Sequence, residues 1–259
     1  MPSLGLGVYL SKDGEEVVNA VHYALDAGYR HIDTAKIYKN EEGVGQALKT
    51  ASVPRDQVFL TTKIWNDDIR AGQTTEALDA SLERLKTDYV DLLLLHWPVK
   101  GFTAAWEALE KALEAGKVRN IGVSNFMPEH LREIYKSGST KPAVNQIEYH
   151  PWNQQLEVLE ICDADDIVVT AWSPLMQGKF KEIPLLATIG EKYGKSAAQV
   201  LLRWDLQTGV TTIPKSTNQG RIQENIDVFD FELTDDEVEK IISLERGERI
   251  GPNPRKFDF

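Results

Sequence analysis

The amino-acid sequence predicts an α/β protein that folds as a (β/α)8 TIM barrel. Short apolar runs alternate with amphipathic stretches eight times along the 259 residues. The runs are rich in β-branched residues and apolar on both faces, which is typical of buried parallel strands. Eight such units in about 250 residues match the usual size of this barrel.

Each expected strand is followed by an expected helix. The strands are expected at residues 4–9, 31–35, 58–65, 90–97, 120–126, 143–149, 167–175 and 210–215. The helices are expected at residues 14–28, 40–51, 74–86, 103–116, 128–138, 153–166, 183–194, 196–209, 221–229 and 234–245. Glycines fall where helices should end, and Asn40 and Thr234 occupy expected N-cap positions.

A doubly wound sheet is the alternative architecture. It usually has a turn with three spaced glycines between a strand and a helix. The only candidate, GLGVYL at residues 5–10, lacks the third glycine. No proline-rich or low-complexity linker divides the chain, so we expect residues 1–259 to form one domain.

Composition narrows the function classes. The net charge of −11 argues against general nucleic-acid or membrane-surface binding. Cys162 is the only cysteine, which excludes an internal disulfide and a multi-cysteine metal site, and the scattered histidines form no ligand set, so no metal is expected. No apolar run is long enough to cross a bilayer, and no signal peptide opens the chain, so a cytoplasmic location is expected.

Polar residues follow several expected strands where each one ends. Active sites of such barrels lie at this rim. The residues of this kind are Asp33, Tyr38, Lys63, His96, Ser124, Asn125, Gln146, Glu148, Trp172, Ser173, Lys215 and Ser216.

Four of these residues suggest a proton donor. Alone, Asp33 could cap a turn, Lys63 could be solvated, His96 could be a core histidine and Tyr38 a surface ring. Together they fall on neighbouring strands, where a buried aspartate and a lysine can pair. An ammonium near a tyrosine favours the phenolate, so Lys63 is expected to lower the Tyr38 pKa while His96 binds a carbonyl oxygen. Lys36 and Lys39 are expected to be solvated loop charges.

The segment KSTNQGR (215–221) predicts an anion site. It places cations and hydroxyls before a helix N-terminus, where backbone N–H groups bind anions. A basic loop before a helix is the alternative explanation for this segment alone.

Several stretches of the chain, which include these polar residues, resemble the aldo-keto reductase family. The matching residues are 28–45, 59–65, 90–98, 121–126, 142–151, 171–175 and 213–233. Within the family, the chain is similar to the bacterial 2,5-diketo-gluconate reductase-like and glyoxal or methylglyoxal reductase-like enzymes. The resemblance implies a single NADP-dependent oxidoreductase domain. It would reduce aldehydes or ketones, such as dicarbonyls and keto-sugar acids, to alcohols, with NADPH as the hydride donor.

The resemblance also implies residue roles. Asp33, Tyr38, Lys63 and His96 match the catalytic residues, with Tyr38 as general acid. The implied cofactor contacts are Ser124, Asn125, Gln146, Trp172, Ser173, Leu175, Lys215, Ser216, Asn218, Arg221, Glu224 and Asn225. Lys215 and Arg221 would surround the adenosine 2′-phosphate that distinguishes NADPH from NADH. The expected substrate contacts are Tyr9, Trp65, His96 and Trp97.

Two departures from the family pattern stand out. The link between the fourth strand and its helix is short, which implies an open substrate pocket. The usual N-terminal hairpin that closes the barrel bottom is absent, which predicts a more exposed barrel floor.

Two alternative functions stay open. One is a Schiff-base aldolase that uses Lys63 or Lys215. The other is a non-catalytic protein that keeps NADPH as a ligand. For the preferred function, the partner is a small carbonyl substrate and the protein is expected to be a monomer.

Overall fold

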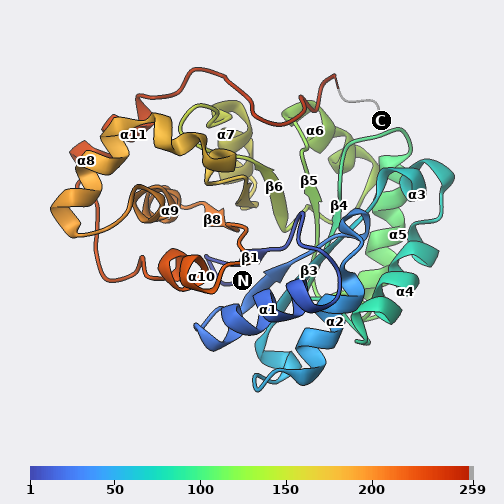
Figure 1. Ribbon diagram of the computed structural model, residues 1–259. Helices are drawn as coiled ribbons and strands as arrows, with labels where there is room; N and C mark the ends of the chain where they lie inside the picture. The colour runs from blue at the N-terminus through green and yellow to red at the C-terminus, as the bar shows by residue number, and fades with distance from the viewer. Residues whose placement is uncertain (257–259) are drawn as a thin grey trace.

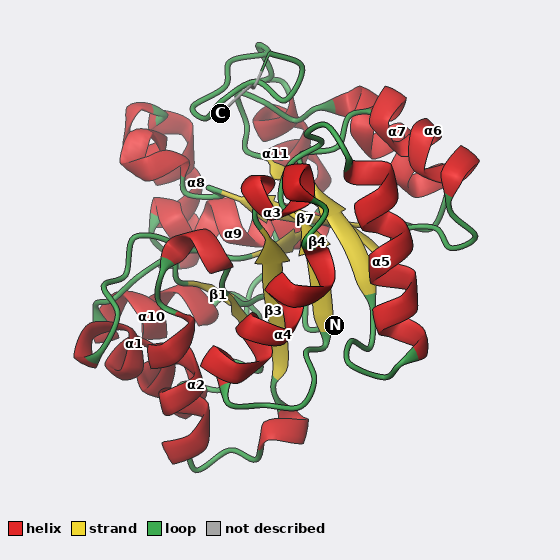
Figure 2. Ribbon diagram, turned by 90° about the vertical axis from the view of Figure 1, so that its right-hand side faces the viewer, coloured by secondary structure: helices red, strands yellow, loops and turns green. Residues whose placement is uncertain are grey.

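Eight parallel strands follow one another in sequence order around a single curled sheet, with helices outside it (Figures 1 and 2). The structure, a computed structural model, describes residues 1–256. The strands are β1 (Leu6–Gly7), β2 (His31–Asp33), β3 (Phe59–Ile64), β4 (Leu92–Leu95), β5 (Ile121–Ser124), β6 (Val144–Glu148), β7 (Val168–Trp172) and β8 (Thr211–Thr212). Bridges from Leu4 to Thr212 and from Gly7 to Lys215 join the first and last strands. The predicted (β/α)8 fold is confirmed.

Every helix expected from the sequence is present. These are α1 (Glu15–Asp26), α2 (Glu41–Thr50), α4 (Thr74–Leu85), α5 (Phe102–Glu114), α6 (Pro128–Ser137), α7 (Leu156–Ala164), α8 (Pro184–Tyr193), α9 (Ala197–Gln207), α10 (Gln219–Ile226) and α11 (Asp235–Ile242). None of them is long and apolar enough to cross a membrane. The structure adds α3 (Asn66–Ala71), which the sequence analysis missed because six residues are too few to show helical periodicity.

Side-chain alternation along the strands divides the barrel into an outside and an inside. Leu93 and Leu95 pack in the large core between strands and helices. Leu92 and Leu94 point the other way and form a separate apolar cluster with Val144, backed by Phe59 and Ala143. This cluster fills the inside of the barrel towards the N-terminal ends of the strands. The polar side chains of the site lie further along the same inward faces.

Side chains of the strands lie at the floor of the barrel. No strand precedes β1 in the part of the chain that the structure describes. Even so, His31, Leu92 and Val144 are buried, and only Phe59 and Ala143 are partly exposed. His31 packs edge-on against Phe59, with ring centroids 5.2 Å apart. Side chains from the strands themselves thus close most of the bottom.

The two expected N-caps have different outcomes. Thr234 caps α11, and Glu237 completes a capping box with it. Asn40 precedes α2 but forms no capping hydrogen bond. Its buried amide instead donates to the carbonyl oxygens of Val8 and Ser11 at 2.9 and 3.0 Å. Buried carbonyl groups need donors, so Asn40 ties the loop after β1 to the loop after β2.

Candidate active site

An ion pair inside the barrel connects β2 with β3. The Lys63 Nζ donates to the Asp33 Oδ1 at 2.6 Å, and the two side chains are 0% and 2% exposed. Lys63 also donates to the Thr34 carbonyl oxygen at 2.9 Å. The Gln146 amide donates to the second oxygen of Asp33 at 2.7 Å. These bonds offset the loss of hydration of the two charges.

Tyr38 lies at the end of a short 3-10 turn, Lys36–Tyr38. The Lys63 Nζ donates to its hydroxyl at 3.3 Å. Lys36 at the start of the turn pairs with Asp68 of α3 at 2.6 Å, so the prediction that Lys36 is a solvated charge is wrong. The pair fixes the turn against α3. The sequence analysis did not predict this ion pair, because it did not predict α3.

The Tyr38 pKa moves in the direction opposite to the one expected from the sequence. Burial raises this pKa well above 10.0, and the negative charge of Asp33 adds to the effect. The hydrogen bond from Lys63 acts the other way. It is long, however, and Asp33 already neutralises the ammonium. Tyr38 is therefore a neutral phenol that holds its proton at neutral pH.

His96 follows β4 and lies beside Tyr38. The two ring centroids are 5.9 Å apart, and the Trp65 ring lies 5.1 Å from His96 on another side. Burial lowers the His96 pKa well below 6.5, and the charge of Lys63 acts in the same direction. The imidazole is thus neutral and carries one N–H that can donate to a ligand oxygen.

The expected substrate-contacting aromatic residues differ in exposure. Tyr9 is 55% exposed, and its ring lies 5.0 Å from Tyr38. Trp65 is partly buried against His96, and Trp97 is buried. The structure therefore brings Tyr9, Tyr38, His96 and Trp65 together as one aromatic cluster.

A second polar network connects β5, β6 and β7. The Ser124 hydroxyl and the Asn125 backbone N–H both donate to the Gln146 carbonyl oxygen at 2.9 Å. The Asn125 amide group donates to the His96 carbonyl oxygen and to Ser124, both at 3.1 Å. Its carbonyl oxygen accepts the Trp172 indole N–H at 2.8 Å. Asn125 thus has only a spare acceptor lone pair to offer a ligand.

The expected anion-binding segment lies between β8 and α10. Asn218 caps α10 by accepting the Arg221 backbone N–H at 3.0 Å, and the Ser216 hydroxyl accepts that of Asn218. Lys215 and Arg221 are exposed, and neither forms an ion pair with a carboxylate of residues 1–256. Ser173, Leu175 and Glu224 are partly exposed, while Asn225 is buried. Two unpaired cations beside a helix N-terminus can hold a phosphate.

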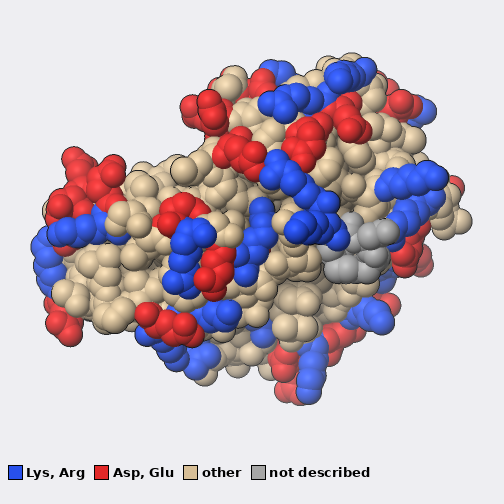
Figure 3. All heavy atoms as spheres, turned by 90° about the horizontal axis from the view of Figure 1, so that it is seen from above, with Lys and Arg blue, Asp and Glu red and all other residues tan. Residues whose placement is uncertain are grey.

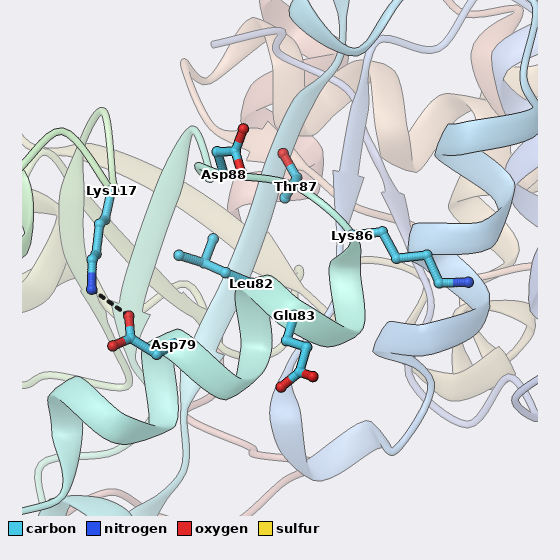
Figure 4. A pocket seen from close by; sticks show the side chains of 7 residues that line it. All are labelled: Asp79, Leu82, Glu83, Lys86, Thr87, Asp88 and Lys117. Carbon is cyan, nitrogen blue, oxygen red and sulfur yellow. Dashed lines mark hydrogen bonds and ion pairs between the residues drawn. The ribbon is translucent and has the colours of Figure 1, made fainter.

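A surface hollow of about 390 Å³ lies elsewhere, beside the end of α4 and the loop leading to β4 (Figure 4). Asp79 and Lys117 pair across it at 2.5 Å. It faces the N-terminal ends of the strands, away from Tyr38 and His96. Within residues 1–256, no group of three His, Cys, Asp or Glu side chains is arranged to hold a metal ion.

The sequence matches the aldo/keto reductase family over residues 3–246. The chain belongs to this family. It is 52% identical over 261 residues to the 9,11-endoperoxide prostaglandin H2 reductase of Trypanosoma cruzi, covering 99% of this chain and 92% of the relative. It is 50% identical over 260 residues to the glyoxal reductase of Bacillus subtilis, covering 100% and 94%. The methylglyoxal reductase DkgA of Escherichia coli is 45% identical over 262 residues, covering 99% and 94%.

Solved structures agree with this membership. An aldo/keto reductase from Brucella melitensis has a TM-score of 0.90 and 48% identity, covering 94% of this chain and 95% of its own. An aldo-keto reductase from Bombyx mori in complex with NADP has a TM-score of 0.91 and 36% identity, covering 97% and 92%. The chain is therefore an oxidoreductase of a carbonyl-reducing family that uses nicotinamide cofactors.

Sequence reasoning gave Asn40 only a capping role and assigned no contact to Asp68 or Glu148, although all three organise the site. Asn40 joins two loops, Asp68 holds Lys36, and Glu148 lies fully buried at the end of β6. Only Glu148 left a signal in the sequence, as a carboxylate in an otherwise uncharged strand.

We predict that Lys63→Met lowers the free energy of unfolding by about 3–5 kcal/mol, because it leaves the Asp33 charge buried without its partner. Adding Asp33→Asn should restore part of the loss. Chemical denaturation of the wild type, both single variants and the double variant measures the effect.

Lys117→Met is the matched control. Its pair with Asp79 is largely exposed, so the loss should stay below about 1 kcal/mol. Equal losses of unfolding free energy for Lys63→Met and Lys117→Met would show that the buried ion pair contributes no more to stability than the exposed one.

Proposed function

We propose that the protein is an NADPH-dependent carbonyl reductase in which Tyr38 is the general acid. One observation carries the proposal: Asp33, Lys63 and Tyr38 form a hydrogen-bonded chain that ends beside the neutral imidazole of His96. In this proposal, a carbonyl oxygen binds between the phenolic proton of Tyr38 and the imidazole N–H of His96.

The chain offers suitable groups for the cofactor. Lys215 and Arg221 lack carboxylate partners within the described residues, so they can neutralise a 2′-phosphate. The Gln146 amide N–H is held by Asp33, which leaves its oxygen to accept from a carboxamide. Trp172 presents an indole ring fixed by Asn125, against which a nicotinamide can stack. Ser124, Ser173, Leu175, Ser216, Asn218, Glu224 and Asn225 would complete the binding site.

Bound NADPH supplies the hydride. Tyr38 supplies the proton to the carbonyl oxygen, and His96 orients that oxygen through its N–H. The high Tyr38 pKa does not block this step, because the alkoxide that forms is a much stronger base than a phenolate. An alcohol, like water, is a far weaker acid than a phenol. Lys63 then stabilises the phenolate that Tyr38 becomes.

We propose small aldehydes and dicarbonyls of the glyoxal type as substrates, with keto-sugar acids such as 2,5-diketo-gluconate as further candidates. Only residues 96–101 connect β4 to α5, so this link is too short to fold over the aromatic cluster. Two relatives, one glyoxal and one methylglyoxal reductase by name, support the choice. We further propose that residues 1–259 act as one domain, as a monomer and in the cytoplasm.

The Schiff-base alternative is less compatible with the geometry. The Lys63 Nζ donates to Asp33, Thr34 and Tyr38, so it is bound as an ammonium rather than free as a nucleophile. The non-catalytic alternative would leave the Tyr38–Lys63–Asp33 chain without a use.

We predict that Tyr38→Phe lowers kcat/KM for glyoxal-type substrates by about 10²–10⁴-fold, because it removes the general acid. NADPH oxidation with a panel of aldehydes, dicarbonyls and keto-sugars measures this. Tyr89→Phe, before β4, is the control and should keep full activity. Full activity of Tyr38→Phe would exclude Tyr38 as the acid, and an inactive wild type would oppose the reductase function itself.

We predict a flat pH profile for reduction between about pH 7 and about pH 9. Tyr38 is active when protonated, and its pKa is raised above 10.0, so it keeps the proton over this range. His96 is already neutral there because its pKa is lowered. Initial rates at saturating NADPH give kcat/KM at each pH. A tenfold decline across this range would show that the Tyr38 pKa is lowered, as the sequence argument held.

We predict that Lys215→Ala combined with Arg221→Ala weakens NADPH binding by about 10²-fold, because two charge-assisted contacts to the 2′-phosphate are lost. NADH binding should change by less than about threefold. Fluorescence titration measures both dissociation constants. Equal weakening of the two cofactors would contradict the phosphate role.

A further inference from the structure

The chain after α11 crosses the top of the molecule, passing α7 and reaching α6 (Figure 1). Seen from above, Lys and Arg side chains alternate with Asp and Glu on this face (Figure 3). Arg255, in the part of this segment that reaches α6, forms ion pairs of 2.7 Å with Glu129 of α6 and Glu157 of α7. We call residues 246–256 the C-terminal strap.

The inner anchor of the strap is Glu148, the last residue of β6. Its carboxylate accepts the backbone N–H groups of Ile250 and Gly251 at 2.5 and 3.1 Å and the His150 ring at 3.0 Å. Burial alone would raise the Glu148 pKa, but these donors outweigh burial and lower it. Glu148 is thus a buried carboxylate whose hydrogen bonds hold a distant backbone segment.

Arg249 adds a second link at the same point. Its guanidinium lies 3.5 Å from the second oxygen of Glu148 and donates to the Gln155 oxygen at 2.5 Å. The Gln155 amide donates back to the Glu148 carbonyl oxygen. The strap is therefore held to the end of β6 through both its backbone and a side chain.

The strap contacts the indole of Trp172. A Cβ atom added to Gly251 would lie 2.3 Å from the Trp172 Cη2 and 3.0 Å from its Cζ3. Trp172 is also the neighbour of Glu148 in the sheet register. The indole is held at its other end by the hydrogen bond from its N–H to Asn125. Its ring plane is therefore fixed from both ends.

We propose that Glu148 is a positioning residue for the nicotinamide half of the cofactor, acting through Gly251 on the Trp172 ring. The inference rests on the proposed function, in which Trp172 stacks on the nicotinamide. Because Glu148 sets the distance of the strap from β7, weakening its two backbone hydrogen bonds releases the edge of the indole. The adenosine half, bound near α10, does not depend on this contact.

The test compares two ligands in two variants. Glu148→Gln weakens the anchor, and Gly251→Ala forces the indole away while leaving the anchor intact. We expect each variant to weaken NADP⁺ binding by about tenfold, the equivalent of one charge-assisted hydrogen bond. Binding of adenosine 2′,5′-bisphosphate, which lacks the nicotinamide, should change by less than about twofold. Isothermal titration measures both, and circular dichroism verifies folding.

Glu110→Gln is the matched control. The Glu110 carboxylate likewise accepts two successive backbone N–H groups, from Ser139 and Thr140 at 2.8 and 2.7 Å, but far from Trp172. It should leave both affinities unchanged. Unchanged NADP⁺ affinity in a folded Gly251→Ala or Glu148→Gln overturns the inference, and so does an equal loss for both ligands. A wild type that binds neither ligand would instead contradict the proposed cofactor.

Discussion

The buried pair between Lys63 and Asp33 is the interaction on which the rest of the site depends. Two charges removed from water are tolerated only when every remaining donor and acceptor finds a partner. Lys63 also donates hydrogen bonds to Thr34 and Tyr38, and Asp33 accepts a hydrogen bond from Gln146. Satisfying the pair therefore places the Tyr38 hydroxyl and the Gln146 amide at fixed points. The proposed proton donor and a proposed cofactor contact are organised by the same electrostatic requirement.

Strand alternation explains why these groups meet at all. Phe59, Thr61 and Lys63 share one face of β3, as Leu92 and Leu94 do on β4. Phe59, Leu92 and Leu94 fill the bottom of the barrel, whereas Lys63, further along β3, carries a charge. A shift of one residue in register would turn Lys63 outward and bring an apolar side chain into the site. The apolar floor thus fixes the register that the polar layer needs.

The sequence predicted the barrel, its helices and the position of Asp33, Tyr38, Lys63 and His96, because these follow from periodicity and from motifs at strand ends. It did not predict what depends on burial. The Tyr38 pKa is raised rather than lowered, since the ammonium expected to act on it is neutralised by Asp33. The Asn40 amide donates to the Val8 carbonyl oxygen instead of capping α2. Lys36 pairs with Asp68 of α3 instead of facing water. Such partners are set by tertiary contact, which local patterns do not encode.

The strap shows the same limit most clearly. Glu148 and Ile250 are 102 residues apart, and their contact is made by a backbone N–H, which leaves no trace in residue type. On the strap side, Gly251 carries a signal in residue type, because any side chain there would displace the Trp172 ring. The proposed catalytic residues thus share the barrel mouth with a ring that Asn125 holds at one end and Gly251 contacts at the other. Under the proposed role of Glu148, the strap after α11 adjusts a site to which Asp33 and Tyr38 contribute from near the start of the barrel.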